Sequence, residues 1–176
     1  TVKVAFSNAN LLQPEAIEHL ITETITIFGG LHVLVNNAGI QFVAPIEEFP
    51  NTKYQNIIAI NMNAAFYASK AAWKQMKKQK FGRIINVSSV HGLRASEFKS
   101  AYVTAKHGVI GMTKVLALEG APFNITCNAI CPGYVKTPLV ITEPDGWNED
   151  DKEFAKVKNY EGVYTKFSNN LNFIED

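Results

Sequence analysis

Short runs of apolar residues alternate along the chain with longer stretches in which apolar residues recur every three or four positions. The short runs cover residues 2–6, 31–37, 83–88 and 125–131, and they read VKVAF, LHVLVNN, RIINVS and ITCNAIC. Runs of this kind are typical of strands buried on both faces, and the stretches between them are typical of helices. The pattern predicts βαβ units, that is, an α/β fold with a parallel sheet and helices on both of its faces.

The same pattern predicts three helices, over residues 14–28, about 61–76 and about 100–119. Pro14 suits the first turn of the first helix, and Gly29 ends it. In the third helix, Gly108 and Gly111 would cost stability unless another element packs closely against them.

Composition and charge exclude several classes of protein. The chain has 176 residues, of which 47% are hydrophobic and 19% charged, and its formal net charge is +1. This length suits one compact domain with its own core, and the charge offers no overall field that would attract nucleic acid. No apolar run approaches the roughly 20 residues of a membrane helix, and no signal peptide is visible at the amino end. We therefore expect a cytoplasmic protein with neither nucleic acid nor membrane as partner.

The two cysteines, Cys127 and Cys131, both lie in the last apolar run. Four residues of a strand span about 13 Å, whereas a disulfide needs Cα atoms less than about 7 Å apart. We therefore expect two buried thiols in a reducing compartment. No histidine stands near them in the sequence, so no metal site is expected.

Small and polar residues follow three of the apolar runs. The segments are NNAG at 36–39, SSVHG at 88–92 and CPGYVKTP at 131–138. Ligands of parallel α/β sheets bind at the carboxyl ends of the strands, where glycine admits a flat group and asparagine or serine offers hydrogen bonds. Each segment alone is equally compatible with an ordinary turn.

Tyr102 stands four residues before Lys106 near the start of the third predicted helix. Residues four apart share a helix face, so the ammonium would favour the phenolate. Lowering the phenol pKa by about two to three units is worth roughly 3–4 kcal/mol and makes a general acid/base usable near neutrality. Ser89, at the end of the preceding strand, could hold a substrate oxygen beside it. The alternative is a tyrosine and a lysine that simply pack at a helix surface.

Together, NNAG, the asparagine of INMNAAF, SSVHG, YVTAK and CPGYVKTP resemble the short-chain dehydrogenase/reductase family over about residues 1–140. The resemblance implies an NAD(P)-binding Rossmann fold in which Tyr102 is the general acid/base and Lys106 lowers its pKa and holds the cofactor ribose. Ser89 would orient the substrate oxygen, and Asn61 would hold a water that relays protons from Lys106. Other implied cofactor residues are Asn10, Asn37, Ala38 and Gly39 near the adenosine, and Pro132, Gly133, Val135 and Thr137 near the nicotinamide.

Within the family, NNAGIQ, FGRIINVSSVHGLRAS, KSAYVTAKHGVIGMTK and NAICPGYVKTPLV resemble the bacterial members that act on D-3-hydroxybutyrate. This likeness implies NAD as cofactor and the interconversion of (R)-3-hydroxybutyrate and acetoacetate. The implied substrate contacts, besides Ser89 and Tyr102, are Gln41, His91, Lys99 and Tyr134, which stands where a tryptophan is usual. Lys99 could instead be an exposed lysine at the helix start, and His91 an ordinary loop histidine.

The sequence departs from the family at both ends. It has no glycine-rich turn for the cofactor diphosphate, so we expect the first strands to be missing. Residues 1–140 would then form a partial dinucleotide-binding domain, and 141–176 a weakly ordered polar tail without the last strand. The alternatives are a reductase of 3-oxoacyl thioesters and a non-catalytic truncated remnant. The family also implies a homo-oligomer, commonly a tetramer, formed through the helices near Asn61 and Ser100.

Overall fold

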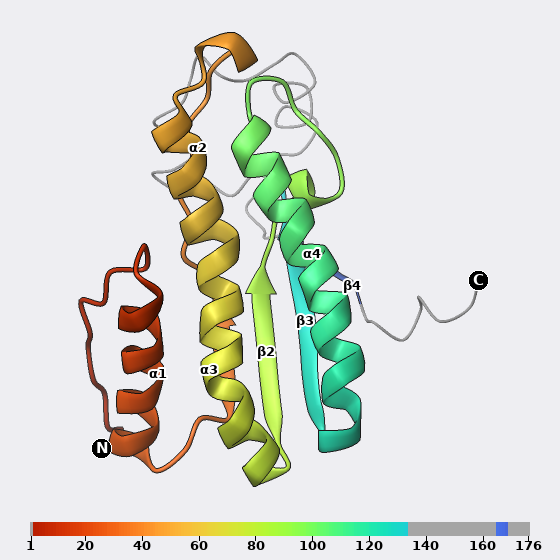
Figure 1. Ribbon diagram of the computed structural model, residues 1–176. Coiled ribbons are helices and arrows are strands. Elements are labelled where there is room, and N and C mark those ends of the chain that lie inside the picture. The colour runs from red at the N-terminus through yellow and green to blue at the C-terminus, as the bar shows by residue number, and fades with distance from the viewer. Residues whose placement is uncertain (1, 134–164, 169–176) are drawn as a thin grey trace.

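A four-stranded sheet in the order β1-β2-β3-β4 forms the centre of the computed structural model, which describes residues 2–133 and 165–168 (Figure 1). The strands are β1 (Val33–Asn36), β2 (Gly82–Val87), β3 (Ile125–Pro132) and β4 (Thr165–Ser168). β1, β2 and β3 pair in parallel, whereas β4 pairs antiparallel with β3. The three parallel strands coincide with the last three apolar runs of the sequence.

Helices precede β1 and connect the parallel strands. They are α1 (Pro14–Phe28), α2 (Asn51–Ile58), α3 (Ala64–Gln79) and α4 (Ser100–Gly120), with the 3₁₀ turns η1 (Ile46–Glu48), η3 (Val90–Gly92) and η4 (Ala121–Phe123). A π-helical turn, η2 (Ala59–Asn63), joins α2 to α3. The first and third predicted helices are confirmed as α1 and α4.

The predicted start of the second helix, near Asn61, is wrong. The helical segment begins at Asn51, directly after Pro50, and Asn61 lies in its interior. Proline readily precedes a helix, and the residues that follow Asn51 are mostly polar, so few apolar residues mark this part of the helix in the sequence.

α1, α3 and α4 pack against one face of the parallel sheet. Leu34, Ile84 and Cys127 stand side by side on three strands and are buried beneath these helices. Figure 1 shows α3 and α4 lying side by side over β2 and β3. Val33 and Val35 alternate with Leu34 along β1 and are about half exposed. Helices were predicted on both faces of the sheet, and within the described residues they cover one of these faces.

Residues 2–6 do not form the predicted strand. Val2, Val4 and Phe6 are exposed, Phe6 by 92%, and the segment is held beside α1 by a 2.9 Å hydrogen bond from Lys3 Nζ to the Ile27 carbonyl. Apolar alternation gives a strand only where a neighbouring strand satisfies its backbone groups. No described strand lies beside this segment.

β4 lies within the polar tail, where no strand was predicted. It runs antiparallel to β3, with Thr165 opposite Pro132. The rest of residues 141–176 lies outside the described residues, so the weakly ordered tail stays a prediction.

Candidate active site

Three predicted catalytic residues meet at the carboxyl end of β2. Ser89 caps η3, where its Oγ accepts a 3.1 Å hydrogen bond from the His91 backbone N–H. Tyr102 and Lys106 lie on the first two turns of α4, with Lys106 Nζ 5.5 Å from the centre of the Tyr102 ring. The His91 ring meets the Tyr102 ring edge-on, with 6.2 Å between their centres. The fold thus gathers a hydroxyl, a phenol, an imidazole and an ammonium at one strand end.

Lys106 is buried, with 4% of its surface exposed, and its Nζ donates a 2.7 Å hydrogen bond to the Val87 carbonyl. Burial lowers the pKa of Lys106 to about 8, and the charge of Cys131 opposes this shift to a smaller extent. An ammonium with a pKa this close to neutrality can take up and release protons under physiological conditions. The site therefore holds a titratable cation beside Tyr102.

Asn61, in the π-helical turn, fixes the loop that follows β1. Its Oδ1 accepts a hydrogen bond from the Ile40 N–H and its Nδ2 donates one to the Ile40 carbonyl, both at 2.8 Å. A Cβ placed on Gly39 would lie 3.6 Å from Asn61 Oδ1 and 3.8 Å from Lys106 Nζ. Asn61 therefore belongs to the same site, and π-helical turns occur frequently at functional sites. Its role in a water relay stays a prediction.

The residues predicted for the adenosine side gather at the end of β1. Asn37, Ala38 and Gly39 are exposed, and Asn37 and Ala38 line a hollow of about 160 Å³ together with Leu11. Asn10 precedes Leu11 and turns the chain towards α1, because its Oδ1 accepts a hydrogen bond from the backbone two residues later. Small exposed residues beside a hollow leave room for a flat group, so these residues fit one part of a nucleotide.

The residues predicted for the nicotinamide side are placed only in part. Pro132 and Gly133 lie at the carboxyl end of β3, level with the ends of β1 and β2. Tyr134, Val135 and Thr137 lie outside the described residues.

Two of the predicted carboxylate contacts are buried. Lys99 is 3% exposed and His91 8%, so the alternative that Lys99 is an exposed lysine is wrong. The loop that carries the half-buried Gln41 is held beside the segment leading into α4 by a 3.0 Å hydrogen bond from the Ala44 N–H to the Phe98 carbonyl. The role of these three side chains in substrate binding stays a prediction.

A buried polar network beneath the site was not predicted from the sequence. Asn36 Nδ2 donates to Asn86 Oδ1 at 2.8 Å, and Asn86 Nδ2 donates to Thr113 Oγ1 at 2.9 Å and to Cys127 Sγ at 3.5 Å. Burial raises the pKa of Cys127 to about 12, although the hydrogen bonds with Thr113 and Asn86 oppose the shift. Asparagines inside apolar strands are a visible signal for such a network, because buried amides need partners.

Other kinds of site receive no support in the part of the chain that the structure describes. Cys127 and Cys131 are buried and not joined by a disulfide, as predicted. Within residues 2–133 and 165–168, His, Cys, Asp and Glu side chains form no group that could hold a metal ion. The described helices also include none with the length and apolar character needed to cross a membrane.

Comparison with known proteins gives consistent matches. Residues 1–146 match the family model of short chain dehydrogenases. The chain is 52% identical over 139 residues to a D-beta-hydroxybutyrate dehydrogenase of Cupriavidus necator, covering 79% of this chain and 54% of that protein. The corresponding Rhizobium meliloti protein is 52% identical over 132 residues, covering 75% and 51%. The chain therefore spans about half the length of these relatives.

Two solved structures are similar in fold. ElxO with NADP bound aligns with a TM-score of 0.75 and 35% identity, covering 80% of this chain and 57% of that one. NAD+-bound xylitol dehydrogenase aligns with a TM-score of 0.70 and 35% identity, covering 73% and 50%. The three parallel strands and the helices around them are thus Rossmann-like.

Proposed function

Because the chain belongs to the short-chain dehydrogenase family, whose oxidoreductases use NAD or NADP, we propose that it interconverts a secondary alcohol and a ketone with NAD. The substrate pair that we propose is (R)-3-hydroxybutyrate and acetoacetate. The observation that carries this proposal is the meeting of Ser89, Tyr102 and Lys106 at the carboxyl end of β2. The names of the two relatives that are 52% identical to this chain over 139 and 132 aligned residues support the choice of substrate.

In the oxidation direction, Tyr102 would take the proton of the substrate hydroxyl, while Ser89 Oγ holds the same oxygen by a hydrogen bond. The Lys106 ammonium, which lies 5.5 Å from the centre of the Tyr102 ring, would stabilise the phenolate form of Tyr102. NAD, when bound, would supply the acceptor for the hydride that leaves the substrate carbon, and NADH would supply the hydride in the reverse reaction. The described residues that would hold the cofactor are Lys106 together with Asn10, Asn37, Ala38, Gly39, Pro132 and Gly133.

The carboxylate of a short hydroxy acid needs a cation or donors at the other end of the pocket. Lys99 lies three residues before Tyr102, about one helical turn away, and its ammonium is buried. His91 packs against the Tyr102 ring and Gln41 lies on the neighbouring loop. These three side chains would hold the carboxylate, whereas a 3-oxoacyl thioester would need a channel for a long carrier arm.

Substitution of Tyr102 tests the proposal. Tyr102→Phe should remove nearly all turnover of 3-hydroxybutyrate and leave the far-UV circular dichroism unchanged, because only the proton acceptor is lost. Tyr54→Phe, in α2, is the matched control and should retain activity.

The outcomes separate the alternatives. Retained turnover in Tyr102→Phe would reject the assignment. Faster turnover of an acyl thioester than of 3-hydroxybutyrate by the wild type would favour the thioester reductase. No turnover of either substrate at saturating NAD would favour the non-catalytic remnant.

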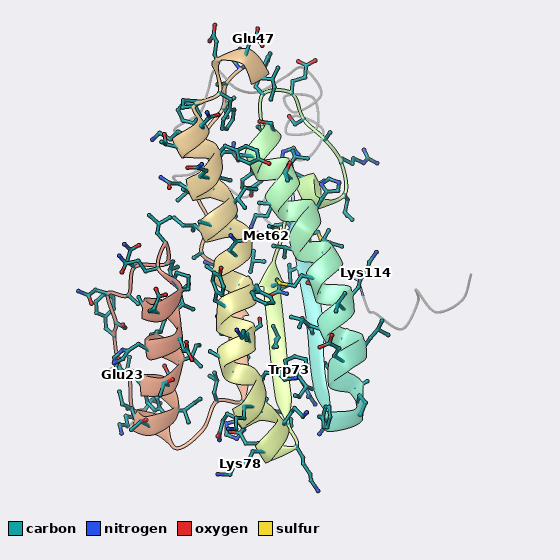
Figure 2. The ribbon with its side chains drawn as sticks, viewed as in Figure 1. Glu23, Glu47, Met62, Trp73, Lys78 and Lys114 are labelled. Carbon is teal, nitrogen blue, oxygen red and sulfur yellow. The ribbon has the colours of Figure 1, made fainter. Side chains whose placement is uncertain are left out.

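We also propose that the chain forms a homo-oligomer through α3 and α4. A groove of about 450 Å³ lies between these helices, and Figure 2 shows Trp73 between them. Its apolar lining residues are Phe66, Trp73 and Leu116, and its other lining residues are Lys70, Lys74, Lys77 and Glu119. On α4, outside the groove lining, Leu118 is also 66% exposed. Exposed apolar surface of this kind gains stability when it is covered. Sedimentation velocity should therefore show a species larger than the monomer, and Leu118→Glu should lower the fraction of that species. A monomeric wild type would contradict the proposal.

A further inference from the structure

Two hydrogen bonds tie Lys106 of α4 to successive residues at the end of β2. Its Nζ donates to the Val87 carbonyl at 2.7 Å, and its own backbone carbonyl accepts a bond from Ser88 Oγ at 2.9 Å. The next residue along the chain is Ser89. Both ends of Lys106 are therefore fixed relative to the strand end that carries Ser89.

The bond from Ser88 is enclosed by protein. Ser88 is buried, and η3 rests directly on α4 at Gly92. A Cβ on Gly92 would collide with Ser88 Oγ and would lie 2.8 Å from the Lys106 carbonyl oxygen and 2.7 Å from Ile110 Cδ1. Because any larger residue would push η3 away from α4, Gly92 keeps water from this hydrogen bond, and a bond in such surroundings is strong and directional.

A second tie between the same strand and helix lies deeper in the core. Asn86 Nδ2 donates to Thr113 Oγ1 at 2.9 Å, and Thr113 lies two helical turns beyond Lys106. Neither side chain is among those predicted for catalysis. This second tie therefore provides a comparison for a hydrogen bond that only stabilises the fold.

We propose that Ser88 is a positioning residue whose hydroxyl sets the placement of α4 against β2, and with it the separation of Ser89 from Tyr102 and Lys106. The inference rests on the function proposed above. A misplacement of about 1 Å between reacting groups can cost on the order of 100-fold in rate. The Lys106 carbonyl keeps its helical partner when Ser88 is changed, so the loss should appear in turnover more than in stability.

Three variants of the full chain test this role. Ser88→Ala should lower kcat for 3-hydroxybutyrate by about 10- to 100-fold with KM nearly unchanged, because substrate contacts remain. Ser88→Thr keeps the hydroxyl and should restore most of the turnover. Thr113→Val should reduce stability and leave kcat near the wild-type value. Wild-type kcat in Ser88→Ala, or an equal fall in Ser88→Ala and Thr113→Val, would overturn the proposal, and so would a Ser88→Ala chain that fails to fold.

A second measurement needs no turnover. In protein labelled with 13C-lysine, the Cε resonance of Lys106, identified by its absence in Lys106→Met, should move in Ser88→Ala and stay in place in Thr113→Val. An unchanged resonance in Ser88→Ala would overturn the positioning role. If the wild type turns over no substrate, the proposed function fails, yet this resonance still decides whether Ser88 places Lys106.

Discussion

Replacing Lys106 by methionine should stabilise the chain near neutral pH while removing a residue that the proposed reaction needs. The side chain is 4% exposed, and its ammonium donates to the Val87 carbonyl. Moving an ammonium out of water is unfavourable even with one good acceptor. Methionine fills a similar volume without charge, so the substitution removes this cost.

The lowered pKa of Lys106 sets the size of the stabilisation expected in Lys106→Met. Burial brings the pKa of Lys106 from 10.5 to about 8. At about 1.4 kcal/mol per pKa unit, the buried charge costs roughly 3 kcal/mol. Losing the hydrogen bond to the Val87 carbonyl offsets about 1–2 kcal/mol of the gain. The expected net increase in the free energy of unfolding at pH 7 is therefore about 1–2 kcal/mol.

The gain in unfolding free energy of Lys106→Met over the wild type should disappear at high pH. Below pH 8 the lysine is protonated in both the folded and the unfolded chain, so the wild type carries the full cost. Between about pH 8 and pH 10.5 the unfolded chain binds more protons, and wild-type stability rises with pH. The difference in unfolding free energy, variant minus wild type, should therefore fall by about 3 kcal/mol across this window and change sign.

Urea denaturation followed by far-UV circular dichroism measures this difference between pH 7 and pH 11. Lys78→Met, at an exposed position of α3 outside the groove, is the control and should give a difference that does not vary with pH. Groups remote from these lysines titrate alike in all variants and cancel. Tyr102 faces Lys106, so the comparison is repeated in a Tyr102→Phe background, which removes the phenol. If the difference in unfolding free energy between Lys106→Met and the wild type stays constant with pH, the reasoning that burial lowers the pKa of Lys106 is refuted.

The buried network and the cofactor site give two further predictions. Asn86→Ala removes the hydrogen bonds that join Asn36, Thr113 and Cys127. In urea denaturation, the free energy of unfolding should fall by about 2–4 kcal/mol. A loss below about 1 kcal/mol would contradict the importance of the network. The 176-residue sequence has no glycine-rich turn for the diphosphate, so NADH should bind this chain more weakly than the micromolar range. A fluorescence titration that gives micromolar affinity would show this hypothesis to be wrong.

The parallel strands could be predicted because they are short apolar runs, and α1 because its apolar period is strong and proline and glycine mark its ends. α4 could be predicted from its long run of helix-forming residues before Gly120, although its apolar period is weak. Residues 2–6 show the limit of this reasoning. Their apolar residues alternate as in a strand, but pairing depends on a neighbour that a local pattern cannot reveal. The π-helical turn at Ala59–Asn63 likewise leaves no local signal, because its residues also suit an ordinary helix.

The candidate site could be predicted as a set of residues but not as a set of contacts. A spacing of four places Tyr102 and Lys106 on one helix face, and the structure shows them there. The acceptor of the Lys106 ammonium is a backbone carbonyl, that of Val87, and backbone acceptors have no signature in a sequence. The burial of Lys99 was also hidden, since a lysine at a helix start is more often exposed.

The polar ties between β2 and α4 have a common physical reason. An apolar helix–sheet contact tolerates small shifts, because dispersion contacts carry little directional preference. The hydrogen bonds from Ser88 and to the Val87 carbonyl do not, and both meet α4 at Lys106. The bond from Asn86 to Thr113 lies deeper and holds the core. If only apolar side chains stood at the end of β2, Lys106 would be buried at a similar free-energy cost, but no hydroxyl would fix its backbone against the strand. The directional bonds therefore belong beneath a site in which the distance from Lys106 to the phenol decides whether the proton can be transferred.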